Sequence, residues 1–155
     1  MDSVGLVAVA AVLLIGVAMG LWRRRTDGRL RPVETEGADN AMTESTDSER
    51  LDPAMLAALG VAPAEATLLQ FSSAFCAPCR AVRRISTEVA ALVPGVQHVE
   101  VDAESHLDEV RALHIWRTPT LLVLDAHGRV TKRATGVPSK PQLIAALGDV
   151  LPARR

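Results

Sequence analysis

The sequence predicts an α/β domain in three layers around a mixed central sheet, preceded by one N-terminal transmembrane helix and a flexible linker. Three observations support this. Residues 4–22 carry no charge, residues 23–52 are basic and then acidic, and residues 53–155 alternate between strand and helix patterns. A chain of 155 residues has room for one domain with accessory segments.

The uncharged run from Val4 to Trp22 is long enough to cross a lipid bilayer as a helix. At about 1.5 Å per residue it spans roughly 28 Å, close to the thickness of the hydrocarbon layer. A cleavable signal peptide would need a basic segment before the run, and only Met1, Asp2 and Ser3 precede it. We therefore expect an uncleaved, single-pass membrane anchor.

The residues that follow the run predict its orientation. Five arginines lie directly after it, at Arg23, Arg24, Arg25, Arg29 and Arg31, while the N-terminal side carries no basic side chain. Basic residues beside a membrane span stay on the cytoplasmic side. We expect the N-terminus outside the cell membrane and the C-terminal domain in the cytoplasm.

Residues 23–52 are predicted to be a flexible linker, because they contain few large apolar side chains and no periodic pattern. After residue 31 this segment holds seven acids, Glu34, Glu36, Asp39, Glu44, Asp47, Glu49 and Asp52, against one base, Arg50. Such composition is typical of a solvated tether. An acidic docking segment is the alternative.

The first half of the domain begins with a short helix, because Asp52 and Pro53 form a helix start and Gly60 a helix end. Residues 67–71 form a short apolar run that predicts a buried strand. A second helix follows Cys79, with apolar residues at helical spacing up to Leu92, and it ends at residues 94–95.

The second half of the domain begins with a strand predicted at residues 96–101. Two helices and two further strands follow it. Leu107, Val110 and Leu113 lie on one face of a helix. Residues 121–124 and 129–134 form a hairpin around the turn at 125–128. The last helix has Ser139 and Gln142 spaced as a capping box, and its expected buried stripe is Leu143, Ile144, Leu147 and Leu151. The element order predicts a sheet with a parallel part and an antiparallel hairpin.

Composition excludes several classes of function. The 17 Lys and Arg residues are balanced by 18 Asp and Glu residues, so the chain lacks the cationic excess that nucleic-acid binding needs. Two cysteines cannot complete a four-ligand zinc site, and the histidines at 98, 106, 114 and 127 are scattered. We expect neither a metal nor another cofactor.

Cys76 and Cys79 lie where a predicted strand passes into a helix. At this spacing both sulfurs lie on one face of the helix and can form a disulfide with little backbone movement. The helix dipole lowers the pKa of a thiol at the Cys76 position, while Cys79 is one turn further in and more sheltered. A structural disulfide across so short a loop would stabilise little, and an inert buried pair is the remaining alternative.

Residues 75–80, Phe-Cys-Ala-Pro-Cys-Arg, and the later Thr118-Pro119-Thr120 before an apolar strand resemble the thioredoxin family, which exemplifies the Cys-X-X-Cys motif. The resemblance covers about residues 65 to 151. It implies a thioredoxin-like fold and dithiol–disulfide exchange, in which Cys76 attacks a substrate disulfide and Cys79 releases the reduced product.

The same resemblance assigns a substrate groove. Pro119 matches the family's cis-proline, and the backbone of Thr118 would pair with an extended substrate peptide, although an ordinary strand-edge proline is the alternative. Trp116 is either a groove wall or a core anchor. The predicted groove residues are Phe75, Ala77, Pro78, Trp116, Thr118 and Pro119.

The sequence departs from the family pattern beside the cysteines. Phe75 replaces the usual tryptophan, and Ala77 replaces the commoner glycine. Gln70 stands where thioredoxins place a buried acid, and His98 falls near the lysine that often pairs with it. Because Gln70 cannot accept a proton as a carboxylate does, the usual proton route is altered, and a neutral His98 replaces it at most in part.

Three further arginines, Arg80, Arg83 and Arg84, add positive charge that would favour the Cys76 thiolate, unless they only form a solvated helix face. The resulting hypothesis is a membrane-tethered reductase for disulfides in proteins or small molecules. Its electron donor would be a thioredoxin reductase or a membrane electron carrier. The alternatives are an outward-facing relay for exported cysteines and a non-enzymatic redox sensor or docking module.

Overall fold

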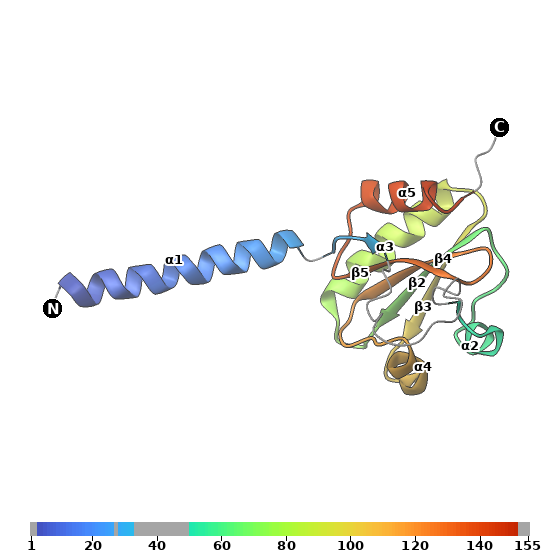
Figure 1. The fold of residues 1–155 in the computed structure, drawn as a ribbon, viewed down its shortest axis with the longest axis horizontal. Coiled ribbons are helices and arrows are strands. Elements are labelled where there is room, and N and C mark those ends of the chain that lie inside the picture. Colours follow the sequence, from blue (N-terminus) through green and yellow to red (C-terminus); the bar gives the residue numbers. More distant parts are fainter. Residues whose placement is uncertain (1–2, 27, 33–49, 152–155) are drawn as a thin grey trace, which may run out of the picture.

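The computed structural model describes residues 3–26, 28–32 and 50–151 and contains one five-stranded sheet (Figure 1). The strands are β1 Arg31–Pro32, β2 Ala66–Ser72, β3 Val96–Asp102, β4 Thr120–Asp125 and β5 Val130–Thr135. Their order is β1-β5-β4-β2-β3. β2 and β3 are parallel, and the pairs β2–β4 and β4–β5 are antiparallel. The prediction of a mixed sheet with a terminal hairpin is confirmed.

Helices cover both faces of this sheet and give three layers (Figure 1). On one face α3, Ala77–Leu92, and α5, Lys140–Gly148, enclose a core around Leu68 and Val82. On the other face α2, Pro53–Ala58, and α4, Leu107–Ala112, accompany a core around Leu69 and Phe71. β2 lies between the two cores and is buried along its whole length, which explains its continuous apolar run.

Several helix ends have the capping interactions and the glycine turn that the sequence predicts. The Asp52 carboxylate accepts a hydrogen bond from the Ala54 N–H at 2.7 Å, which caps α2. Ser139 and Gln142 form the predicted capping box of α5. Gly95 has a φ of 83° where α3 turns into β3.

Two apolar positions differ from the prediction. Ile144 is 45% exposed, because α5 faces the sheet with Leu143, Ala146 and Leu147, and Ile144 lies a third of a turn away from that face. Leu107 is also exposed, at the start of α4, whereas Leu113 at its end is buried. The buried stripe predicted for the last helix was therefore wrong at Ile144, and the apolar face predicted for the helix at residues 107–113 is exposed at Leu107.

Both ends of the segment predicted as a linker contact the domain. At residues 28–32, β1 pairs with the outer edge of β5, and Leu30 packs against the core on the α3 side. At residues 50–52, Arg50 forms a bridge to Arg129 and Leu51 is buried. The predicted start of the linker was wrong, because residues 23–26 continue the helix α1. The rest of the predicted linker, residue 27 and residues 33–49, lies outside the described residues.

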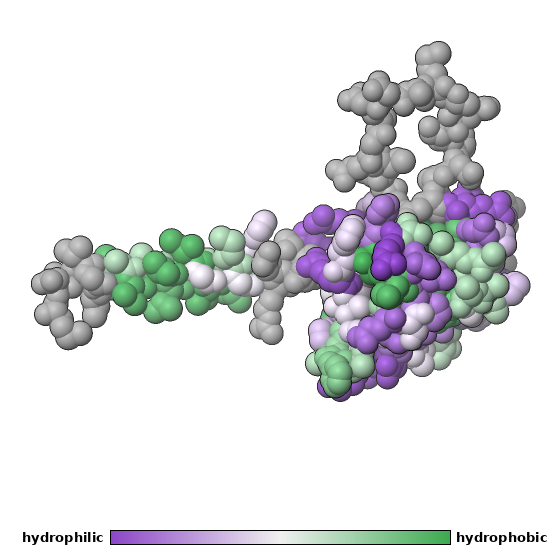
Figure 2. All heavy atoms as spheres, turned by 90° about the horizontal axis from the view of Figure 1, so that it is seen from below, coloured by the Kyte–Doolittle hydropathy of each residue, from purple (hydrophilic) through white to green (hydrophobic). Residues whose placement is uncertain are grey.

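The N-terminal helix α1 spans Ser3–Thr26 and contains the uncharged run (Figure 1). Its described side chains, residues 7–22, are exposed and largely apolar on the face seen in Figure 2. Within the part of the chain that the structure describes, no helix has the length and hydropathy required to cross a membrane. The transmembrane helix therefore stays a prediction.

Candidate active site: the Cys76–Cys79 disulfide

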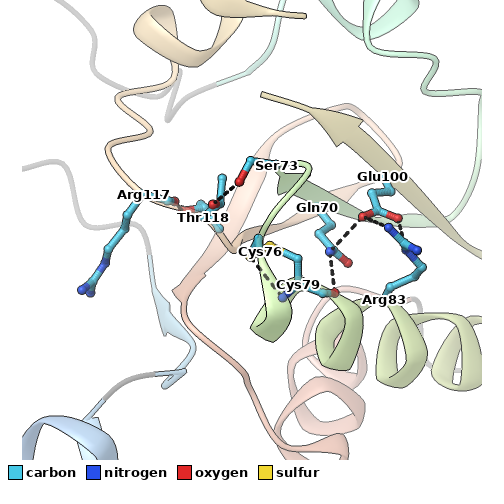
Figure 3. The surroundings of a disulfide bond; sticks show 9 residues. Gln70, Ser73, Cys76, Cys79, Arg83, Glu100, Arg117 and Thr118 are labelled. Carbon is cyan, nitrogen blue, oxygen red and sulfur yellow. Dashed lines mark hydrogen bonds and ion pairs between the residues drawn. A yellow bond between two sulfur atoms is a disulfide. The ribbon is translucent and has the colours of Figure 1, made fainter. Parts of the chain in front are cut away.

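The two cysteines lie where β2 ends and α3 begins, and they form a disulfide (Figure 3). Cys76 is the N-cap residue of α3, and Cys79 lies in its first turn. The helix starts here because Pro78 is tolerated only in the first turn, where a backbone N–H is not required. The sequence thus places both sulfurs at the positive end of a 16-residue helix.

The two sulfurs differ in exposure. Cys76 is partly exposed, whereas Cys79 is only 1% exposed. The Cys76 Sγ accepts a hydrogen bond from the Cys79 backbone N–H at 3.2 Å. In the reduced protein the same N–H group and the helix dipole would stabilise a Cys76 thiolate. Cys76 is therefore the more accessible sulfur of the pair and Cys79 the more sheltered one, as the sequence predicts, and the attacking role of Cys76 stays a prediction.

The loop before β4 lies beside the disulfide (Figure 3). The Thr118–Pro119 peptide bond is cis, so the cis-proline prediction is confirmed and an ordinary strand-edge proline is excluded. The Thr118 hydroxyl lies 3.1 Å from that of Ser73, which precedes Cys76 by three residues. The Pro119 carbonyl accepts a hydrogen bond from the Gly136 N–H at 2.9 Å, which fixes the loop against the end of β5.

Two large aromatic side chains are exposed near this site. Phe75, directly before Cys76, is 101% exposed, and Trp116, two residues before Thr118, is 86% exposed. The reading of Trp116 as a core anchor is therefore wrong. Ala77 and Pro78 are exposed as well. Exposed apolar groups on both segments that adjoin the dithiol are suited to contact a partner.

Gln70 is completely buried beneath the first turn of α3. Its side-chain N–H group donates to the Cys79 carbonyl at 3.0 Å and to Glu100 at 3.4 Å (Figure 3). Its oxygen lies 3.2 Å from the His98 Nε2 atom. This amide oxygen can only accept, so His98 Nε2 carries a proton, and in the neutral imidazole Nδ1 accepts from the Thr87 hydroxyl at 3.3 Å. Gln70 joins β2, β3 and α3 without providing a base.

Burial lowers the pKa of His98, and the nearby Glu100 carboxylate opposes this effect only in part. The imidazole is therefore neutral at neutral pH, which agrees with its hydrogen bonds. The structure brings together the two predicted proton-transfer residues, Gln70 and His98, and connects them to Cys79 through its backbone carbonyl.

Sequence reasoning did not find Glu100. Its carboxylate accepts two hydrogen bonds from Arg83, one of them 2.8 Å long from Nη2, and this ion pair lowers the pKa of Glu100. The positive charge of Arg83, which was expected to favour the Cys76 thiolate, is therefore offset by the negative charge of Glu100. Arg80 and Arg84 lie on the exposed face of α3. Alternation along β3 could have indicated Glu100, because residues 98 and 100 point the same way.

No group of three side chains suited to hold a metal ion occurs among the described residues.

Comparisons with known proteins agree with this fold and site. The family model for thioredoxin matches residues 57–149. The thioredoxin H4-1 protein of Oryza sativa subsp. japonica is 29% identical over 85 residues, which cover 53% of this chain and 63% of that protein. The chain thus spans about three-fifths of the length of this curated relative.

Solved structures show the same fold at low identity. A thioredoxin mutant from Halobacterium salinarum NRC-1 has a TM-score of 0.56 at 16% identity, covering 73% of this chain and all of that chain. Chloroplastic thioredoxin z has a TM-score of 0.53 at 19% identity, covering 72% and 97%.

The fold and the cysteine pair together define a thioredoxin-like domain with a Cys-X-X-Cys disulfide at a helix start. Its cysteines have the spacing, the position at a helix start and the facing cis-proline loop of a redox-active pair. The family match covers more than half of the chain. The protein belongs to the thioredoxin family.

Proposed function

We propose that this protein is a membrane-tethered disulfide reductase that works in the cytoplasm. The observation that supports the exchange chemistry best is the accessible Cys76 sulfur at the start of α3, beside the cis-Pro119 loop. Its substrates would be disulfides in proteins or small molecules. Its electrons would come from a thioredoxin reductase or from a membrane electron carrier.

The proposed reaction has two balanced steps. The Cys76 thiolate attacks one sulfur of the substrate disulfide, so a mixed disulfide forms and the other substrate sulfur leaves as a thiolate. The Cys79 thiolate then attacks the Cys76 sulfur and releases the second substrate thiolate. The substrate gains two electrons, the protein ends with the Cys76–Cys79 disulfide, and an external dithiol donor must reduce that disulfide again.

Cys79 must lose its proton before the second step. The buried Gln70 amide beside it cannot accept that proton. The substrate thiolate released in the first step is a base of matched strength, since free thiols have a pKa of about 8.5. We therefore assign the proton of Cys79 to the departing thiolate rather than to a residue of the protein.

The proposed tether rests on the N-terminal segment. Residues 4–22 are uncharged, and the described side chains of α1 are exposed, among them Leu14 at 71% and Val12 at 69%. An exposed apolar helix is stable in a bilayer, where its backbone is hydrogen-bonded internally. The arginines after residue 22 favour the cytoplasm for the domain.

Turnover of a model disulfide with a dithiol donor tests the proposed activity. The wild-type chain should reduce it catalytically, and Cys76→Ser should abolish turnover because the attacking sulfur is lost. Full activity of Cys76→Ser would contradict the proposal.

Membrane fractions washed with alkaline carbonate should retain the full chain, and an impermeant maleimide should label a cysteine placed near the N-terminus of intact cells.

A redox sensor is the second candidate, and the buried Gln70 favours it. An amide at this position cannot take the proton of the resolving cysteine as a carboxylate would. A sensor would switch reversibly between dithiol and disulfide, yet it would show no turnover with a dithiol donor.

A further inference from the structure

We propose that residues 28–32 hold the dithiol side of the domain against the bilayer surface, so that the substrate is a disulfide in a membrane protein close to that surface. This inference rests on the proposed function, because it requires that α1 lies in the membrane and that the cysteines exchange disulfides. It adds the class of substrate, a disulfide in a membrane protein, and a reason why residues 28–32 are docked onto the domain.

The first observation is the docking of residues 28–32 onto the edge of the sheet. The Gly28 N–H donates to the Thr135 carbonyl at 2.6 Å. In β1, Arg31 pairs with Arg133 in antiparallel register, and Leu30 packs against the core. Backbone pairing and apolar burial together attach this segment to the domain.

Gly28 shows that the docking is specific. Its φ is 82°, and a Cβ atom there would lie 2.1 Å from the Val137 carbonyl oxygen and 2.5 Å from the Val137 carbonyl carbon. These are backbone atoms that cannot rotate away as a flexible side chain would. Only glycine fits against Val137 in this conformation.

The short connection to α1 then limits the distance between the domain and the membrane. α1 ends at Thr26, and the two residues to Gly28 extend over at most about 7 Å. A free linker over residues 23–52 would instead allow separations of about 30 Å. The docked segment therefore keeps the edge of β5 beside the end of the helix.

The end of β5 to which Gly28 is docked lies at the same end of the sheet as the dithiol, because β5 and β2 run in the same direction on either side of β4. The Thr135 hydroxyl accepts a hydrogen bond from Arg117 at 2.9 Å, and Thr135 pairs with Thr120, which follows the cis-proline. Figure 1 shows α1 leaving from the side of the sheet where α3 begins. In Figure 3, β1 and the end of α1 lie on the Arg117 side of the disulfide.

The exposed residues on this side suit a membrane surface. Phe75 and Trp116 are aromatic side chains of the kind found at the headgroup level. Arg29, Arg31 and Arg117 are exposed cations, which anionic lipid headgroups attract. A disulfide presented a short distance above the bilayer would reach Cys76 without release of the domain.

Full-length protein in vesicles of phosphatidylcholine with anionic phosphatidylglycerol provides the test. One disulfide peptide is offered free in solution, attached to lipid by a short spacer, or attached by a long spacer. We expect wild-type protein to reduce the short-spacer peptide at least tenfold faster than the long-spacer peptide. A flexible insertion of twenty Gly and Ser residues after Thr26 should reduce this ratio at least threefold, because it lengthens the tether and leaves the docking intact.

Two matched alanine variants separate docking from other effects. Gly28→Ala should reduce the ratio in the same way, because its Cβ collides with Val137. Gly148→Ala should behave as wild type, because a Cβ there meets nothing within 4 Å. Reduction of the free peptide should be unchanged in all three variants, which shows that each is folded and active.

The outcomes distinguish this inference from the proposed function. An unchanged ratio in the insertion variant, with normal reduction of the free peptide, would overturn the inference alone. A failure of wild-type protein to reduce the free peptide would overturn the proposed exchange function and the inference with it. Removal of the wild-type chain from vesicles by carbonate would overturn the tether and, again, the inference.

Discussion

The buried amide of Gln70 should stabilise the active-site end of the fold, and Gln70→Leu tests this. The change removes the donor to the Cys79 carbonyl and the acceptor for His98 Nε2, with little change in volume. A buried group left without a partner costs about 1–3 kcal/mol. The Cys79 carbonyl keeps its hydrogen bond within α3. The free energy lost at this carbonyl is therefore at the lower end of that range. We expect a total of about 2–4 kcal/mol, a large part of the 5–15 kcal/mol typical of a domain.

Urea unfolding of the oxidised full-length protein in detergent micelles, followed by circular dichroism, measures this loss. Gln97→Leu is the matched control on the neighbouring strand. Its side chain donates to the Ala62 carbonyl, which water can reach, and to the hydroxyl of the buried Thr67 at 3.0 Å, so we expect a smaller loss of about 1 kcal/mol. A Gln70→Leu variant as stable as the wild type would refute the structural role of the amide.

Three further predictions concern pH, charge and substrate contact. Because burial lowers the pKa of His98 below its ordinary 6.5, the unfolded chain binds more protons below that pH. The free energy of unfolding should therefore fall as pH decreases from 7.5 to 5.5, and His98→Gln should reduce this dependence in urea titrations. Arg83→Gln should raise the pKa of Glu100 towards 4.5, as measured by NMR titration, yet change the stability little because the ion pair is partly exposed. Phe75→Ala and Trp116→Ala should each lower kcat/KM for a protein disulfide by about 5- to 30-fold, which is the effect of losing an aromatic contact. The kcat/KM for a small disulfide should change little. Equal losses for both substrates would contradict a contact role.

The elements nearest the cysteines could be predicted because their signals are local. The helix start at Cys76 follows from the strand that precedes it and from Pro78. The cis bond before Pro119 came from the family resemblance and not from the residues themselves. The capping box at Ser139 is a short pattern that requires no tertiary information.

Other features depend on contacts between distant segments. Arg31 and Pro32 have no strand pattern, and they form β1 because β5 offers an unpaired edge. The pairing of Arg83 with Glu100 depends on how α3 packs over β3. The exposure of Trp116 could not be decided from its amphipathic side chain, because it is set by the course of the loop before β4.

The division of roles between the cysteines is the central claim, and a trapped mixed disulfide tests it most directly. Reduced Cys79→Ser protein, mixed with a disulfide peptide, should form a stable covalent adduct that mass spectrometry maps to Cys76, because the resolving thiol is absent. Reduced Cys76→Ser protein should form almost none, since Cys79 is 1% exposed. Equal adduct formation at Cys79, or no adduct at Cys76, would contradict the account.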